Sequence, residues 1–155
     1  MELKELKGKY GEYEKKYGLP SFAKLNEQFE IEKIEKESDI FLRVVRKTMM
    51  DKIVNSLSFL DMLLNPINAP RVYLNYIKSM NGKDKELLDN VYGIFSELSL
   101  ACLPLELEYG EKNEAEMINR IYQQWEKIRP DFLEVLNRVH KPEKGEARKE
   151  RSYFG

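Results

Sequence analysis

The sequence is poor in the residues that build disulfide frameworks and metal centres. It has one cysteine, Cys102, and one histidine, His140, among 155 residues. Because an intrachain disulfide needs two cysteines and zinc sites need clusters of Cys and His, neither is available. No Glu-x-x-His pair occurs, which argues against a di-iron bundle. We therefore expect no cofactor and no metal. The one alternative that the sequence leaves is a magnesium site made of carboxylates alone.

Catalytic patterns are also missing. Cys102 stands in apolar sequence without a neighbouring His, and His140 has no Ser or Cys in a recognisable catalytic setting. Neither GKY nor GKD has the glycine pattern of a phosphate-binding loop. The residues therefore predict no catalytic residue and do not favour an enzyme.

Long hydrophobic runs and a surplus of one charge are absent too. No apolar run approaches the ~18 residues of a membrane span, and the N-terminal MELKELK lacks the apolar core of a signal peptide. The 26 basic and 27 acidic residues leave a net charge of −1. Proteins that bind nucleic acid or anionic membranes usually carry a basic surplus, and the net charge of this chain shows none. The net charge does not exclude a local basic patch. We expect a cytoplasmic protein without a membrane partner.

Composition leaves the growth temperature of the source open. Lys and Glu together make 39 residues while Gln numbers three, which is typical of thermophiles. Ten Asn residues point the other way.

Strand-like alternation is nearly absent, whereas apolar residues recur at three- and four-residue spacing. Turn and cap residues divide this pattern into helices. We predict helices at 3–17, at 22–29 after Ser21, from Ser38 or Asp39 to Leu64, from Asn68 and Pro70 to Asn81-Gly82, from Asp84 to Tyr109, and from Asn113 to Val139. Pro104 and Pro130 are expected to kink the last two, since each removes an amide donor.

Long helices with short connections predict one all-α, single-domain antiparallel bundle of about five or six helices over residues 1–140. Two helices supply the expected core stripes. These are Leu42, Val45, Met49, Ile53, Leu57, Leu60 and Leu64 on the third, and Ile118, Ile121, Trp125, Ile128, Phe132, Leu136 and Val139 on the last.

The stretch KYGEYEKKY near the N-terminus combines tyrosines with lysines, as single-strand nucleic-acid binders do. Residues 1–18 hold five Lys and four Glu, however, so the local charge is only +1. Tyr10, Tyr13 and Tyr17 form a helical stripe, and such stripes usually pack. We therefore interpret residues 1–20 as a docking helix or arm.

Segment 98–109, LSLACLPLELEY, is apolar on two sides. Leu98, Cys102, Leu105 and Tyr109 form one stripe, and Leu100, Leu103 and Leu107 form another about 160° away around a helix. Such a helix is buried on both sides. It is either the central helix of the bundle or one that faces a second subunit, and the sequence favours neither.

Arg46 lies on the apolar side of its predicted helix, where a guanidinium needs a carboxylate partner. Glu106 projects toward the same side of its own helix. We predict a buried Arg46–Glu106 ion pair that fixes helix register.

Residues 141–155 form a charged tail with net charge +2 that ends in Ser-Tyr-Phe-Gly. Tyr153 and Phe154 could anchor it to an unknown protein, or the tail could lie on its own bundle. The leading hypothesis is a non-catalytic interaction or scaffolding protein that forms a homodimer through Leu100, Leu103 and Leu107. The alternatives are a nucleic-acid-binding helical protein, which the charge does not favour, and an enzyme with a buried Arg/Glu site.

Overall fold

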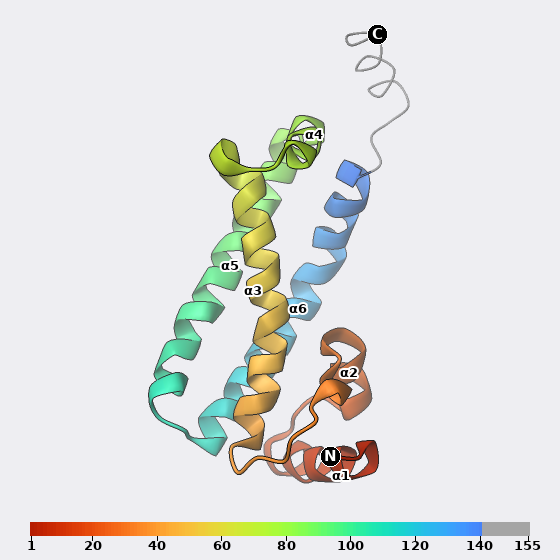
Figure 1. The fold of residues 1–155 in the computed structure, drawn as a ribbon, viewed down its shortest axis with the longest axis vertical. Coiled ribbons are helices and arrows are strands. Elements are labelled where there is room, and N and C mark those ends of the chain that lie inside the picture. The colour runs from red at the N-terminus through yellow and green to blue at the C-terminus, as the bar shows by residue number, and fades with distance from the viewer. Residues whose placement is uncertain (141–155) are drawn as a thin grey trace.

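The computed structural model describes residues 1–140 and is helical throughout that range, without strands (Figure 1). The predicted all-α bundle is confirmed. The α-helices are α1 (Leu3–Tyr17), α2 (Phe22–Phe29), α3 (Phe41–Leu64), α4 (Arg71–Ser79), α5 (Gly82–Leu107) and α6 (Glu111–His140). Two short 3₁₀ helices, η1 (Ile31–Lys33) and η2 (Pro66–Asn68), lie in the connections.

Three long helices form the core of the bundle. α3, α5 and α6 pack against one another and alternate in direction along the chain, so α5 runs antiparallel to the other two (Figure 1). α1 and α2 lie at one end of this bundle, and α4 lies at the other (Figure 1). The two ends are therefore built by different parts of the chain and can differ in surface chemistry.

The first helix boundaries follow from local cap chemistry. Gly18 ends α1 with φ 62°, a left-handed conformation that glycine adopts without steric cost. Ser21 then begins α2, because its side-chain oxygen accepts a hydrogen bond from the backbone amide of Lys24 at 3.3 Å. Both boundaries agree with the prediction.

Several other boundaries differ from the prediction. α3 begins at Phe41, two to three residues later than expected. Asn81 does not close α4 but caps α5, where its side chain and that of Asp84 each accept a backbone hydrogen bond from the other residue. α6 begins at Glu111, so Asn113 lies inside its first turn. In the last two cases a polar residue that fits a cap in sequence lies a few residues from the actual helix start.

α5 and α6 continue through Pro104 and Pro130 respectively, so neither proline splits its helix. The predicted core stripes are largely buried. On α3, Leu42, Val45, Met49, Ile53 and Leu60 are fully buried, and on α6 the same is true of Ile118 and Ile121. Leu57, Leu64 and Leu136 pack on the edge of the core.

α1 packs by its aromatic side. Tyr10 is fully buried, and its hydroxyl donates a hydrogen bond to the carbonyl of Pro20 at 2.6 Å. Tyr13 stacks on Phe41 of α3 with ring centroids 5.7 Å apart. The tyrosines therefore attach α1 to the bundle instead of presenting a row of free rings.

Candidate functional site

A buried cluster of charges joins α3, α5 and the first turn of α6. Arg46 is 1% exposed and Glu114 is fully buried. The Nε atom of Arg46 lies 2.5 Å from Oε2 of Glu114, and its Nη2 atom lies 3.4 Å from the other carboxylate oxygen. Burial of two charges is costly unless they are paired and hydrogen-bonded, and this geometry satisfies both conditions.

The predicted partner, Glu106, belongs to the same cluster. Nη2 of Arg46 donates to Oε1 of Glu106 at 2.8 Å, and Nζ of Lys47 lies 3.1 Å from the second oxygen. The side chain of Glu106 is 37% exposed, so this pair lies at the solvent edge of the cluster. The structure thus brings Arg46 and Glu106 together, but it places Glu114 deeper.

Arg43 completes the cluster from one turn earlier on α3. Its Nε lies 3.3 Å from Oε1 of Glu114, and its Nη2 donates to the backbone carbonyl of Leu105. Arg43 also lies over the ring of Tyr109, 5.3 Å from the centroid. Two guanidiniums therefore share one buried carboxylate, and together they tie three helices at the α5–α6 turn.

The electrostatics of the cluster favour its charged forms. Burial alone would lower the pKa of Arg46, but hydrogen bonds to Glu114 and Glu106 outweigh burial and raise it. The hydrogen bond from Arg46 holds the pKa of Glu106 below its usual value. Glu106 is consequently a weaker base than a free carboxylate, which does not suit proton abstraction near neutral pH.

The sequence contains a signal for the burial of Glu114. Glu114 precedes Ile118, Ile121 and Trp125 at spacings of four, three and four, so it continues the apolar stripe of α6. Asp84 similarly continues the buried stripe of α5 toward its N-terminus and pairs with Arg138 of α6. In both cases a carboxylate on an apolar stripe is buried and pairs with an arginine, although Arg138 itself is half exposed.

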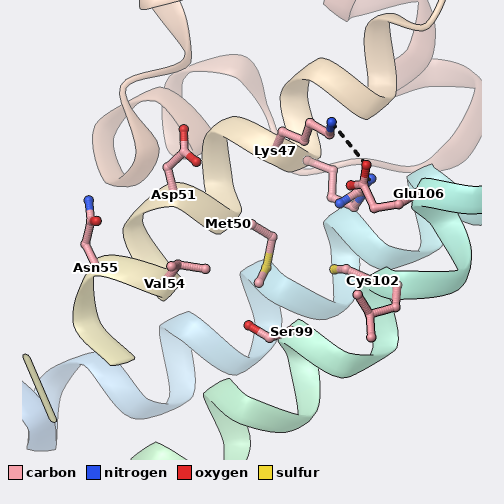
Figure 2. Close-up of a pocket in the computed structure, with 10 residues that line it drawn as sticks. Lys47, Met50, Asp51, Val54, Asn55, Ser99, Cys102 and Glu106 are labelled. Atoms are coloured by element: carbon pink, nitrogen blue, oxygen red, sulfur yellow. Dashed lines mark hydrogen bonds and ion pairs between the residues drawn. The ribbon is translucent and has the colours of Figure 1, made fainter. Parts of the chain in front are cut away.

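A groove of about 530 Å³ lies beside this cluster, between α3 and α5. We call it the α3–α5 groove. Figure 2 shows Met50 of α3 and Ser99 and Cys102 of α5 pointing into it, with the Lys47–Glu106 ion pair at one end. Val54 and Leu103 also line it and are both exposed. The groove therefore has a largely apolar floor, an ion pair at one end, and Asp51 and Asn55 along its α3 side.

The second apolar stripe of α5 borders the groove and faces solvent. Leu100 is 65% exposed, Leu103 57% and Leu107 89%. We call these three side chains the α5 ridge. The opposite stripe, Leu98, Cys102 and Leu105, is buried in the bundle. Within residues 1–140, α5 is therefore covered on one side only, and the interpretation as a central helix buried on both sides does not apply.

The remaining predicted reactive groups have structural surroundings. Burial raises the pKa of the Cys102 thiol, which favours the protonated, unreactive form. His140 is the last residue of α6, and its Nδ1 lies 2.8 Å from the hydroxyl of Tyr76 on α4. Among residues 1–140 no group of three or more His, Cys, Asp or Glu side chains is arranged to hold a metal ion.

The basic residues of α3 are engaged with the protein itself. Arg43 and Arg46 bind Glu114, Lys47 binds Glu106, and Lys52 donates to the carbonyl of Gln28. Arg43 turns toward the α5–α6 junction, where it contacts Glu114 and the carbonyl of Leu105. The α3 cations are thus poorly placed to form a phosphate-binding track.

Tyr153, Phe154 and the rest of the predicted tail lie outside the described residues. No described helix combines the length and the apolar character needed to cross a bilayer. Comparison with family models, with curated proteins and with solved structures gives no match.

Proposed function

We propose that this protein is a non-catalytic interaction protein that forms a homodimer through the α5 ridge and the adjoining α3–α5 groove. The observation that carries the proposal is the exposure of Leu100, Leu103 and Leu107 side by side on one helix face. Scattered exposed leucines are ordinary, but a contiguous apolar row beside an apolar groove is typical of a protein contact surface.

Self-association suits this surface because the ridge and the groove adjoin. In a two-fold symmetric dimer each copy offers the same patch, so a ridge on one subunit can enter the groove on the other and the reverse. Leu103 belongs to both features, since it stands on the ridge and lines the groove. A patch that carries both the protruding and the hollow element can complement a copy of itself.

The expected affinity is modest. The ridge exposes an area equivalent to about two leucine side chains, and a symmetric dimer buries it twice, which contributes roughly 6 to 12 kcal/mol. Association costs about 4 to 15 kcal/mol in lost freedom. With a cost near the low end of that range, the upper half of the burial range leaves roughly 5 to 8 kcal/mol, so we expect a dissociation constant of about 1 to 200 µM.

The test is sedimentation velocity from about 1 to about 300 µM, a range that brackets this constant. Leu103→Asn is expected to weaken the dimer by roughly thirtyfold, because both subunits lose a buried leucine. Leu133→Asn on α6 is the matched control, since Leu133 is 49% exposed and lies off the ridge. A monomer at every concentration, or equal effects of the two variants, would refute the proposal.

One feature of the α3–α5 groove favours an enzyme, and one argues against it. The α3–α5 groove does lie beside Arg46 and Glu106, as a catalytic site there requires. The lowered pKa of Glu106, however, makes its carboxylate a weaker base, and the raised pKa of Cys102 keeps this nucleophile in its unreactive thiol form near neutral pH. The geometry therefore supports the interaction proposal better.

A further inference from the structure

The end of the bundle that carries η2 and α4 has a charge pattern unlike the rest of the molecule. Residues 62–85 contain four basic residues and one acidic residue. The basic residues Arg71, Lys78, Lys83 and Lys85 are all exposed. The acidic one, Asp84, is 2% exposed and pairs with Arg138. Every exposed charge in this segment is therefore positive.

The neighbouring elements do not reverse this pattern. The first exposed carboxylates outside the segment are Asp61 on α3 and Glu86 on α5, each about one helical turn, or roughly 5 Å, from the end of its helix. On α6, the exposed Glu134 lies about two turns before the last residue, His140. The α4 cations and Lys83 thus lie nearer this end of the bundle than the exposed carboxylates, whereas Lys85 and Glu86 are consecutive residues of α5.

The same end exposes apolar side chains. Ile67 in η2 is 93% exposed, Val72 58% and Leu74 39%. The inner side of α4 is formed by Tyr73, Tyr76 and Ile77, which pack on the bundle. We call Ile67, Val72, Leu74 and the four cations of residues 62–85 the α4 tip. Apolar side chains among long cationic ones are typical of segments that lie in the headgroup region of a bilayer.

The chain as a whole is divided by charge. Residues 62–85 carry a net charge of +3. All residues outside 62–85 and 141–155 comprise seventeen basic and twenty-three acidic ones, a net charge of −6. Near an anionic surface, this division would turn the α4 tip toward the surface and the remainder away from it.

We propose that the α4 tip is a docking surface for an anionic lipid bilayer. The near-neutral total charge argued against a membrane partner, but the positive charge is concentrated at one end. Each cation near an anionic leaflet strengthens binding by a factor of about five, and entry of Ile67 into the interface adds roughly a factor of ten or more. A wholly exposed isoleucine adds nothing to binding of phosphate groups alone, so a lipid surface fits this end better than nucleic acid.

The experiment is cosedimentation of the full chain with phosphatidylcholine vesicles containing either no phosphatidylserine or about 30% of it, at low and at physiological salt. We expect binding only to the anionic vesicles, weakened by salt. Lys83→Gln/Lys85→Gln should reduce the partition coefficient roughly twenty- to thirtyfold. Lys4→Gln/Lys15→Gln, two exposed lysines of α1 at the other end, is the charge-matched control and should change it less than about twofold.

A second pair of variants tests the apolar contribution. Ile67→Asn should weaken vesicle binding roughly tenfold, whereas Leu3→Asn, on α1 and 46% exposed, should leave it unchanged. Absence of binding to anionic vesicles at low salt would overturn the proposal. So would equal losses in the control variants, or tighter binding to a nucleic-acid duplex that is insensitive to Ile67→Asn. Dimer formation has no part in this outcome, because the α5 ridge and the α4 tip share no residue.

Discussion

Replacement of Glu114 by glutamine is expected to destabilise the protein far more than any other removal of a single carboxylate at the α5–α6 turn. The substitution keeps the shape of the side chain but removes the charge that two guanidiniums share. Because Arg46 is 1% exposed and Glu114 fully buried, the loss leaves a buried charge without its main partner. Such losses cost about 3 to 5 kcal/mol of the free energy of unfolding.

Two matched substitutions separate the possible causes. Glu106→Gln removes a partner of the same arginine whose side chain is 37% exposed, so solvent screening limits its cost to about 1 kcal/mol or less. Glu116→Gln removes an exposed carboxylate from the same first two turns of α6 as Glu114. It therefore reports the effect of charge near the helix N-terminus, about 0.3 to 1 kcal/mol, without the buried pair.

The assay is urea unfolding followed by the fluorescence of Trp125, the single tryptophan, which is 6% exposed and packs on Phe29 and Phe95. The slope of free energy against urea should stay constant while the midpoint falls. Arg46→Met/Glu114→Leu should recover part of the loss, since an apolar pair of similar volume replaces a buried ionic one. Equal urea midpoints for Glu114→Gln and Glu116→Gln would show that Glu114 stabilises the protein only through the helix dipole, and would refute a contribution from its buried ion pairs.

Acid is also expected to destabilise the bundle. Arg46 lowers the pKa of Glu106, and Lys16 and Tyr17 lower that of Glu111. Both carboxylates therefore add stability above their unfolded pKa of 4.5, and this stability is lost as the pH falls through the lower folded pKa. Between about pH 7 and about pH 3.5, the urea midpoint should fall less in Glu106→Gln than in the wild type. Gly93→Ala is expected to raise the free energy of unfolding by about 0.5 to 1 kcal/mol, because Gly93 lies inside α5 and an added Cβ meets no atom within 4 Å. A lower midpoint in Gly93→Ala would contradict this.

The helix set could be predicted from sequence because its signals are local. The left-handed cap at Gly18 and the hydroxyl cap at Ser21 act within four residues, so neighbouring sequence contains the whole cause. The helix starts at Gly82 and Glu111 were misplaced because Asn81, Asp84 and Asn113 are all acceptable caps. Which of them caps depends on how the connected helices fit together, and that is not a local property.

The ion-pair cluster was only partly predictable, for a related reason. An arginine on an apolar stripe predicts that a carboxylate faces it, and the helical positions of Arg46 and Glu106 suggested one candidate. The spacing that makes Glu114 part of the α6 stripe was equally visible. Its pairing with Arg46 depends on the parallel arrangement of α3 and α6, which brings the first turns of both helices to the same end of the bundle.

The sequence by itself determined that α5 is apolar on two sides, because the three- and four-residue spacing of its leucines is fixed by helix geometry. Only the tertiary structure decided which side is covered. With three long helices, α3 and α6 pack against the Leu98–Cys102–Leu105 stripe, and no described element lies over Leu100, Leu103 and Leu107. The residues of a helix determine how much apolar surface it carries, whereas the number and placement of neighbouring helices determine how much of that surface is buried.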